Sequence, residues 1–374
     1  MVVGVPRETK DGEHRVAITP DGVHELLSQD VAVLVERGAG AGSSIADDDY
    51  AAAGAELVDR ADDVWGRAEL VVKVKEPQPD ELPLLRPGLV LFTYLHLAAY
   101  PAVADALLAS RATGVAYETV QTAGGSLPLL APMSEVAGRM APQIGAHFLE
   151  REQGGRGVLL GGAPGVRPAR VVVIGAGTVG SNAAWIAQGM EAEVLLFDRN
   201  LDRLRWVDQI HRGRIMTLAS TRLAVERAVT EADLIIGAVL VPGGRAPIVV
   251  TEAMVRSMRR GAVVVDCAID QGGSVEGISE TSHASPIDER HGVLHYAVGN
   301  IPGAVPHTST YALTNATLPY VAALASQGVT DATGTDVDLA GGVNTCNGQV
   351  TSSAVAEALG RPLVALADAL AARG

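Results

Sequence analysis

Three glycines, Gly175, Gly177 and Gly180, have the spacing of a loop that binds the phosphates of a dinucleotide. The apolar run RVVVI (170–174) precedes them, a helical stretch follows, and a second apolar run ends at Asp198. In such a loop the first glycine permits a tight turn, the second lets the pyrophosphate approach the backbone, and the third lets helix and strand pack closely. The free N–H groups at the start of the helix then face the phosphates. The pattern therefore predicts a strand, loop and helix that bind a nucleotide.

Asp198 follows the glycine loop at about the 20-residue spacing that places a carboxylate beside the adenosine ribose. Such a carboxylate accepts hydrogen bonds from the ribose hydroxyls and repels a 2′-phosphate, which favours NAD over NADP. The neighbouring Arg199 is a cation, which leaves the strictness of this selectivity open. A second glycine-rich stretch, GAGAG (38–42), also follows an apolar run, but three aspartates at 47–49 would repel a phosphate there. We interpret that stretch as a plain turn.

Polar side chains also stand at or after the ends of several apolar runs, where ligands bind in open parallel sheets. An arginine there can clamp a carboxylate with two hydrogen bonds, and a lysine can polarise a carbonyl oxygen. A histidine can move a proton near neutral pH, and a carboxylate can serve as an acid, a base or an anchor for an iminium. Such groups suit hydride transfer on a 2-oxo or 2-amino acid. They are Arg15, Lys75, Tyr94, His96, Asp266, Asp270 and Asn300.

Taken singly, each of these residues also has a plain structural interpretation. Arg15 and Lys75 have the character of ordinary surface cations, and His96 lies in an apolar segment that suits a core histidine. The sequence context does not separate Asp266 from Asp270, because either can face a ligand or cap a helix. The coincidence of complementary polar groups at several strand ends favours the functional interpretation.

The elements that position these residues form two series in which strands alternate with helices. Alternation of this kind implies parallel sheets covered on both faces, and six strands are enough for a complete dinucleotide-binding sheet. The first series has apolar runs at 2–5, 31–36, 69–75, 89–96 and 114–120, and the second has runs at 170–177, 192–198, 214–220, 232–240, 261–270 and 294–300.

Capping signals and the C-terminal pattern complete this outline. Thr19 is expected to cap a helix that begins with Pro20, and Ser134 to cap a long helix that Pro142 can kink. After residues 301–310 the pattern is helical, so the C-terminal segment has no sheet of its own. We expect it to pack on the first domain or across the hinge.

Composition bounds the class of protein. With 374 residues, of which 48% are hydrophobic and 3% aromatic, the chain suits two α/β domains built from small aliphatic residues. The formal charge of −14 argues against nucleic acid or an anionic membrane as the main partner. Cys267 and Cys346 are too few for a disulfide framework, and no metal-ligand spacing is visible. Without a signal segment or a membrane-length apolar stretch, a cytoplasmic protein is expected.

Seven motifs occur in order along the chain: GVPRETKDGEHRVAITPDGV (4–23), KVKEP (73–77), YLHLA (94–98), MSEVAGRMA (133–141), VIGAGTVG (173–180), AIDQGG (268–273) and GNIPGAVPHTSTYALTNATLPY (299–320). Through these motifs the chain resembles the bacterial alanine dehydrogenases, members of the alanine dehydrogenase and transhydrogenase alpha-subunit superfamily, over essentially its whole length. The resemblance implies an α/β fold of two Rossmann-like, doubly wound parallel-sheet domains with a cleft between them. The substrate domain would comprise 1–128 plus 307–374, and the NAD-binding domain 129–306.

The same resemblance implies the reaction and the roles of residues. The reaction is the NAD-dependent oxidative deamination of L-alanine to pyruvate and ammonia, and its reverse, within L-alanine catabolism. Arg15 and Lys75 would bind the substrate, and His96 and Asp270 would be catalytic. Family members commonly form hexamers, so a homo-oligomer is expected. Besides the three glycines, NAD contacts are implied for Ser134, Thr178, Val179, Asp198, Arg203, Ser220, Val239, Leu240, Cys267, Ala268, Ile269, Asp270, Val298, Gly299, Asn300 and Ile301.

Three other functions fit parts of the pattern. The soluble NAD-binding subunit of a proton-translocating transhydrogenase resembles the same family, but YLHLA (94–98) argues against it because a subunit that only exchanges hydride needs no substrate histidine. Another amino-acid dehydrogenase, such as a saccharopine-type enzyme, would keep the chemistry and change the substrate. A non-catalytic NAD-binding sensor would bind NADH without turning over any oxo acid.

Overall fold

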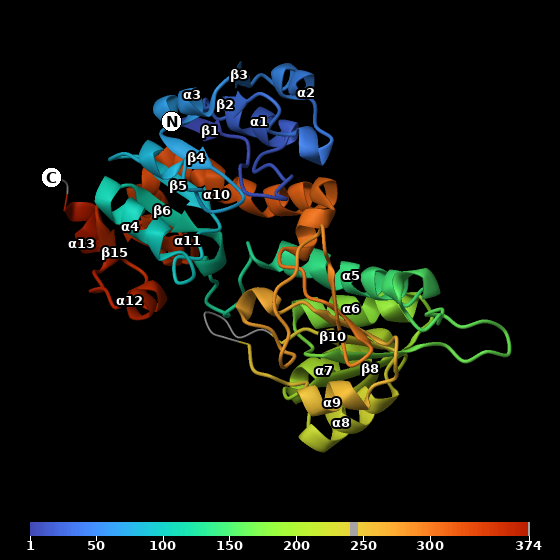
Figure 1. Cartoon of the computed structure of the whole chain (residues 1–374). Coiled ribbons are helices and arrows are strands. Elements are labelled where there is room, and N and C mark those ends of the chain that lie inside the picture. The colour runs from blue at the N-terminus through green and yellow to red at the C-terminus, as the bar shows by residue number, and fades with distance from the viewer. Residues whose placement is uncertain (240–245, 373–374) are drawn as a thin grey trace. The chain divides into compact units, whose positions relative to one another are not determined.

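The computed structural model describes residues 1–239 and 246–372 and divides the chain into two compact units. One unit comprises Met1–Met133 and Val305–Gly374, and the other comprises Ser134–Ala304. In Figure 1 the first unit runs from blue to teal, resumes in orange with α10 and ends in red, whereas the second runs from green to orange. The sequence placed the boundaries after residues 128 and 306, and the structure divides the chain after 133 and 304.

The second unit is built on a seven-stranded sheet in the order β12-β13-β11-β10-β7-β8-β9. All neighbouring strands are parallel except β12, which pairs antiparallel with β13. The six strands predicted for this part of the chain are present, and β12 at the sheet edge was not predicted. The strands are β7 (Arg170–Ile174), β8 (Glu193–Asp198), β9 (Met216–Ala219), β10 (Leu234–Gly237), β11 (Val263–Asp266), β12 (Ile287–Arg290) and β13 (Val293–Tyr296).

Helices cover both faces of this sheet, as a parallel sheet requires. Val171 and Val173 of β7 pack into one hydrophobic cluster together with α5 and α6, whereas Val172 and Ile174 pack into another with α8 and α9. The helices are α5 (Ala131–Phe148), α6 (Thr178–Gly189), α7 (Leu201–His211), α8 (Arg222–Glu231) and α9 (Glu252–Ser257), with short 3-10 turns η4 (Arg151–Gln153), η5 (Ile269–Gln271) and η6 (Ile301–Ala304).

The first unit repeats this architecture with additions from the C-terminal segment. Its eight strands lie in the order β15-β14-β6-β5-β4-β1-β2-β3, and β1 to β6 are parallel. Short β3 was not predicted from the sequence. The strands are β1 (Val2–Val5), β2 (Ala32–Glu36), β3 (Glu56–Val58), β4 (Leu70–Val72), β5 (Val90–Thr93), β6 (Thr113–Ala116), β14 (Val343–Cys346) and β15 (Gln349–Val350).

The C-terminal segment is not wholly helical, which corrects the sequence-based expectation. β14 pairs antiparallel with β6 and with β15, so the tail extends the sheet of the first unit. The helices of this unit are α1 (Pro20–Leu27), α2 (Asp47–Ala52), α3 (Ala61–Arg67), α4 (Pro101–Ser110), α10 (Pro306–Thr335), α11 (Val337–Gly342), α12 (Ser353–Leu359) and α13 (Leu366–Ala371), and the 3-10 turns are η1 (Ala41–Ser43), η2 (Leu82–Leu84) and η3 (Tyr117–Thr119).

Of the two helix caps predicted from the sequence, Thr19 and Ser134, the structure contains the first. Thr19 caps α1 as predicted, because its hydroxyl accepts the Gly22 N–H at 3.3 Å. Ser134 does not cap α5, since that helix begins three residues earlier at Ala131 and continues through Pro142. Within the described residues, no helix has the length and apolarity that crossing a membrane requires.

A histidine is buried in the core of the second unit. His295 of β13 is 1% exposed, and neither ring nitrogen has a hydrogen-bond partner among the described residues. Its register neighbours are Asp288 on β12 and Val264 on β11. Burial lowers the pKa of His295 to about 4, although the charge of Asp288 opposes this change. The imidazole is therefore neutral in the folded protein at neutral pH.

Candidate active site

The glycine loop joins β7 to α6 and has the geometry predicted for it. Gly175 has φ +108°, and a Cβ there would lie 2.4 Å from the carbonyl oxygen of Ala238. A Cβ at Gly180 would lie 1.7 Å from the carbonyl oxygen of Gly175, so only glycine lets α6 pack this closely. A Cβ at Gly177 would instead meet no atom nearer than the Arg203 guanidinium at 3.8 Å. Two glycines thus shape the loop, and the third leaves open space at the start of α6.

Asp198 closes the other side of this loop. Its carboxylate accepts the Ala176 N–H at 2.6 Å and the Asn200 N–H at 2.7 Å. Arg203 approaches it at 3.8 Å, and the Asp198 side chain is only 10% exposed. The carboxylate is therefore fixed at the carboxyl end of β8 rather than free in solvent, whereas Arg199 is exposed.

The remaining residues predicted to contact NAD lie mainly at the carboxyl ends of neighbouring strands. Ser220 follows β9, Val239 follows β10, residues 267–270 follow β11 and residues 298–301 follow β13. Thr178 and Val179 begin α6, Arg203 lies in α7, and Ser134 lies in the first turns of α5. Leu240 is outside the described residues.

The structure separates the two aspartates that the sequence left equivalent. Asp266 is fully buried and accepts hydrogen bonds from Ala268 N, from Ser274 N and Oγ, and from Val275 N, at 2.7 to 3.1 Å. These bonds oppose the effect of burial, which raises the pKa of Asp266. Asp270 is exposed, four residues further on in η5. Asp266 therefore shapes the turn after β11, and Asp270 is the carboxylate open to a ligand.

Asp270 stands beside the turn that follows β13. A Cβ on Gly299 would lie 2.8 Å from Asp270 Oδ1 and 1.9 Å from Glu280 Oε1, so a side chain at this position would displace the ends of these two carboxylates. Asn300, the next residue, has φ +62°, and its carbonyl oxygen lies 3.3 Å from His283 Nε2. Glu280 and His283 were not singled out from the sequence, because the stretch that contains them has no strand or helix pattern.

In the first unit, Arg15 is held by an acidic neighbour. The Arg15 side chain is 2% exposed, and it donates from Nε to Glu13 Oε1 at 2.7 Å and from Nη2 to Glu13 Oε2 at 2.5 Å. Its Nη1 lies 3.0 Å from the sulfur of Met133. Burial raises the pKa of the Glu13 carboxyl, but the charge of Arg15 and its hydrogen bonds outweigh burial and lower it to about 2. Arg15 is therefore a buried, oriented cation and not an ordinary surface residue.

A buried charge cluster supports the segment that carries Lys75. Glu8 accepts the Val74 backbone N–H at 2.6 Å and the Lys75 backbone N–H at 3.4 Å. The Lys73 ammonium has no exposed surface and contacts Glu81 at 2.7 Å and Glu8 at 3.3 Å. Burial alone lowers the pKa of Lys73, but the charges of Glu8 and Glu81 outweigh it and raise that pKa. The segment after β4 is thus fixed by ionic contacts on its buried side.

His96 follows β5 in a left-handed backbone conformation, with φ +45°. Glu118 accepts the His96 N–H at 2.6 Å and the Leu95 N–H at 3.2 Å, and Glu118 Oε1 lies 3.7 Å from His96 Nδ1. The ring of Tyr94 stacks parallel to the imidazole, with 5.8 Å between centroids. The His96 side chain is 39% exposed, so the histidine is not a core residue.

Sequence reasoning missed the acidic residues that orient these cations and this histidine. Glu13 was detectable, because it lies two residues from Arg15. Glu8 and Glu118 were not, since each reaches its partner only across the sheet. Among the described residues, no group of three or more histidine, cysteine or acidic side chains is placed to hold a metal ion.

The second unit combines a glycine loop, a fixed carboxylate at the next strand end and the strand order of a dinucleotide-binding sheet. These features together define the protein as a nucleotide-binding α/β protein. Comparison with known families makes this specific. Residues 4–137 match the family described as "Alanine dehydrogenase/PNT, N-terminal domain", and residues 141–353 match "Alanine dehydrogenase/PNT, C-terminal domain". The chain belongs to this alanine dehydrogenase/PNT family.

Individual relatives agree with this assignment. The chain is 56% identical to an alanine dehydrogenase of Mycolicibacterium smegmatis over 99% of this chain and 100% of that protein. It is 54% identical to an alanine dehydrogenase of Bacillus subtilis, over 99% of this chain and 98% of that protein. A solved L-alanine dehydrogenase matches with a TM-score of 0.94 and 50% identity, and the match covers 96% of this chain and 99% of that structure. A transhydrogenase from Sinorhizobium meliloti matches with a TM-score of 0.81 and 25% identity, and the match covers 95% of this chain and 100% of that structure.

Proposed function

We propose that this chain is an NAD-dependent alanine dehydrogenase, which interconverts L-alanine with pyruvate and ammonia. The observation that carries the proposal is the identity of 50 to 56% with alanine dehydrogenases over nearly the whole chain. Likeness to a transhydrogenase is lower, at 25% identity. An exposed histidine on a fixed loop is also a group that a subunit exchanging only hydride does not need.

The residues of the second unit fit NAD. The open space at Gly177 leaves room for a pyrophosphate, and the N–H groups at the start of α6 face an anion there. The Asp198 carboxylate stands at the strand end where ribose hydroxyls bind and repels a 2′-phosphate. NAD, when bound, supplies the hydride acceptor for the Cα–H of alanine. Ser220, Val239 and the turns 267–270 and 298–301 complete the proposed contacts.

The roles of the other residues follow from their chemistry. Arg15, oriented by Glu13, holds the substrate carboxylate, and Lys75 stabilises the oxygen that develops when water adds to the iminium. His96, held by Glu118, moves the proton of that water. Asp270, in the second unit, assists proton transfer and retains the cationic intermediate. General acid–base help of this kind contributes roughly 10²- to 10⁴-fold in rate.

The protein's partners are small molecules: alanine, pyruvate, ammonium and NAD. We place it in the cytoplasm as a homo-oligomer, with the homohexamer as the assembly to test, and its net charge of −14 disfavours nucleic acid. Sedimentation velocity of the purified chain measures this assembly directly.

The test is NADH oxidation by the purified protein with pyruvate, with and without ammonium, and again with NADPH. The proposal expects oxidation that requires ammonium and is specific to NADH. NADH binding without any oxidation refutes it in favour of a transhydrogenase subunit or a sensor. In the variant His96→Ala, turnover falls by roughly 10²-fold or more while the Kd for NADH stays the same. Near-normal turnover would remove His96 from the mechanism.

A further inference from the structure

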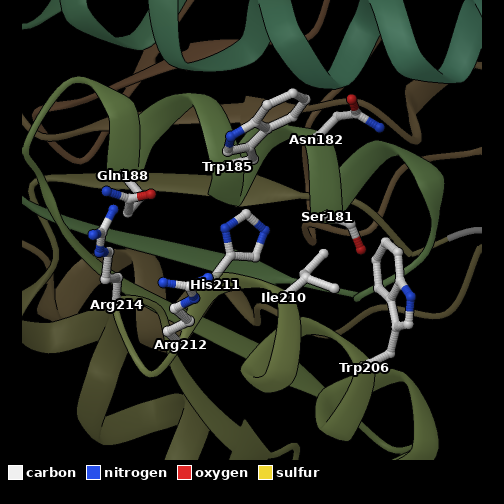
Figure 2. A pocket seen from close by; sticks show the side chains of 9 residues that line it. All are labelled: Ser181, Asn182, Trp185, Gln188, Trp206, Ile210, His211, Arg212 and Arg214. Carbon is white, nitrogen blue, oxygen red and sulfur yellow. The ribbon is translucent and has the colours of Figure 1, made fainter.

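A groove on the second unit is lined by none of the residues assigned above, although it adjoins the glycine loop at Ser181, whose hydroxyl donates to Ala176 O at 3.1 Å. It has a volume of about 560 Å³ and runs between the outer faces of α6 and α7. Figure 2 shows Trp185 of α6 on one side, Trp206 of α7 at one end, and His211 and Ile210 between them. Neither the glycine loop nor any substrate residue lines it.

The groove exposes aromatic surface that proteins normally bury. Trp185 is 47% exposed and Trp206 55% exposed, whereas Trp65, the third tryptophan of the chain, is 1% exposed. Ile210 between them is 49% exposed. Indole rings are large and polarisable, and burying them against a ligand contributes more than burying most other side chains. Two exposed indoles in one groove therefore mark a recognition surface.

The charged groups of the groove all have the same sign. Arg212 and Arg214 stand at the end opposite Trp206. The Arg139 guanidinium lies over the Trp185 ring, 5.0 Å from its centroid. The residues that line the groove include no aspartate or glutamate, although the whole chain has a formal charge of −14. The groove is thus a cationic surface on an acidic protein, and its charge selects an anion.

We propose that this groove is a second nucleotide site, which binds a purine nucleoside di- or triphosphate. A purine base stacks on an indole face, and such stacking contributes about 1–3 kcal/mol per base. The phosphates pair with the forked guanidinium groups of Arg212 and Arg214, whose geometry suits bidentate contact. On the α6 wall, Gln188 supplies hydrogen bonds to the base or ribose, and the Ser181 hydroxyl, which donates to Ala176 O at 3.1 Å, accepts one more. The volume lies within the range of small-molecule sites.

The test separates this groove from the dinucleotide site. Protein saturated with NADH, whose binding is first measured by itself, is titrated with ATP in a calorimeter. The proposal expects one further ATP per chain that NADH does not displace. Trp206→Ala and the double variant Arg212→Gln with Arg214→Gln each weaken ATP binding at least tenfold and leave the Kd for NADH unchanged. The exposed Arg227→Gln in α8 is the matched control and leaves ATP binding unchanged.

Three results overturn the proposal. ATP that fails to bind the NADH-saturated protein, or that binds unaffected by either groove variant, shows that the groove takes no nucleotide. A change in assembly mass of Trp206→Ala in sedimentation velocity shows that the groove holds a second copy of the chain instead. Equal weakening by Arg227→Gln shows only non-specific attraction of an anion. Failure of NADH itself to bind counts against the proposed function, not against the groove.

Discussion

Replacement of Glu13 by glutamine tests whether a buried carboxylate holds Arg15 ready for substrate. The glutamine amide keeps the size of the side chain, but its NH₂ group faces an Arg15 nitrogen that donates to Glu13 Oε2 in the native protein. The fall of the Glu13 pKa from 4.5 to about 2 corresponds to about 3 kcal/mol of stability at neutral pH. We therefore expect Glu13→Gln to lower the free energy of unfolding at pH 7 by about 3 kcal/mol.

The pH dependence and the kinetics provide two independent readouts. Because the folded-state pKa is lowered, this contribution is complete above pH 4.5 and is lost as pH falls toward 2, so the two proteins converge on acidification. Urea unfolding followed by circular dichroism measures it. The KM for pyruvate should rise by about tenfold, with the Kd for NADH unchanged. The exposed Glu357→Gln in α12 is the control. Native stability together with a native KM in Glu13→Gln would refute the reasoning.

The remaining predictions concern Glu118, His295 and the two aspartates, Asp266 and Asp270. Glu118→Gln loosens the loop after β5, so kcat falls by about tenfold or more with the Kd for NADH unchanged; weaker NADH binding in a direct titration would contradict this. Because buried His295 stays neutral, the free energy of unfolding of the native protein falls by about 1.4 kcal/mol per pH unit between pH 6.5 and pH 4. In His295→Leu the urea midpoint should change less with pH over this range. An equal pH dependence in the two proteins would show that the histidine is solvated and contradict the prediction. Asp266→Asn lowers the free energy of unfolding by about 3 kcal/mol, because the buried carboxylate accepts hydrogen bonds from its own turn. Asp270→Asn changes the free energy of unfolding by less than about 0.5 kcal/mol and lowers kcat. The reverse pattern in unfolding and rate assays would make Asp270 the structural residue and Asp266 the catalytic one.

The fold followed from local patterns because its strands are short apolar runs between helices, and parallel strands buried on both faces show such runs clearly. The glycine loop was also recognisable locally, since its spacing and the close approach of Gly180 to Gly175 belong to a segment of six residues, although Gly175 also packs against Ala238. Four strands were not predicted from the sequence, namely β3, β12, β14 and β15. Each has at most four residues and lies at or near a sheet edge, where pairing with a neighbouring strand decides the conformation.

Sequence patterns alone establish the two α/β units, the nucleotide loop and the residue types at the strand ends. Which of those residues are held by hydrogen bonds and which are open to a ligand depends on the three-dimensional fold. Asp266 and Asp270 have the same chemistry, and four donors from its own turn distinguish the first from the second. Likewise, Glu118 reaches the His96 loop from a segment more than twenty residues away. Hydrogen bonds and burial depend on distance in space, and short sequence patterns do not encode that distance.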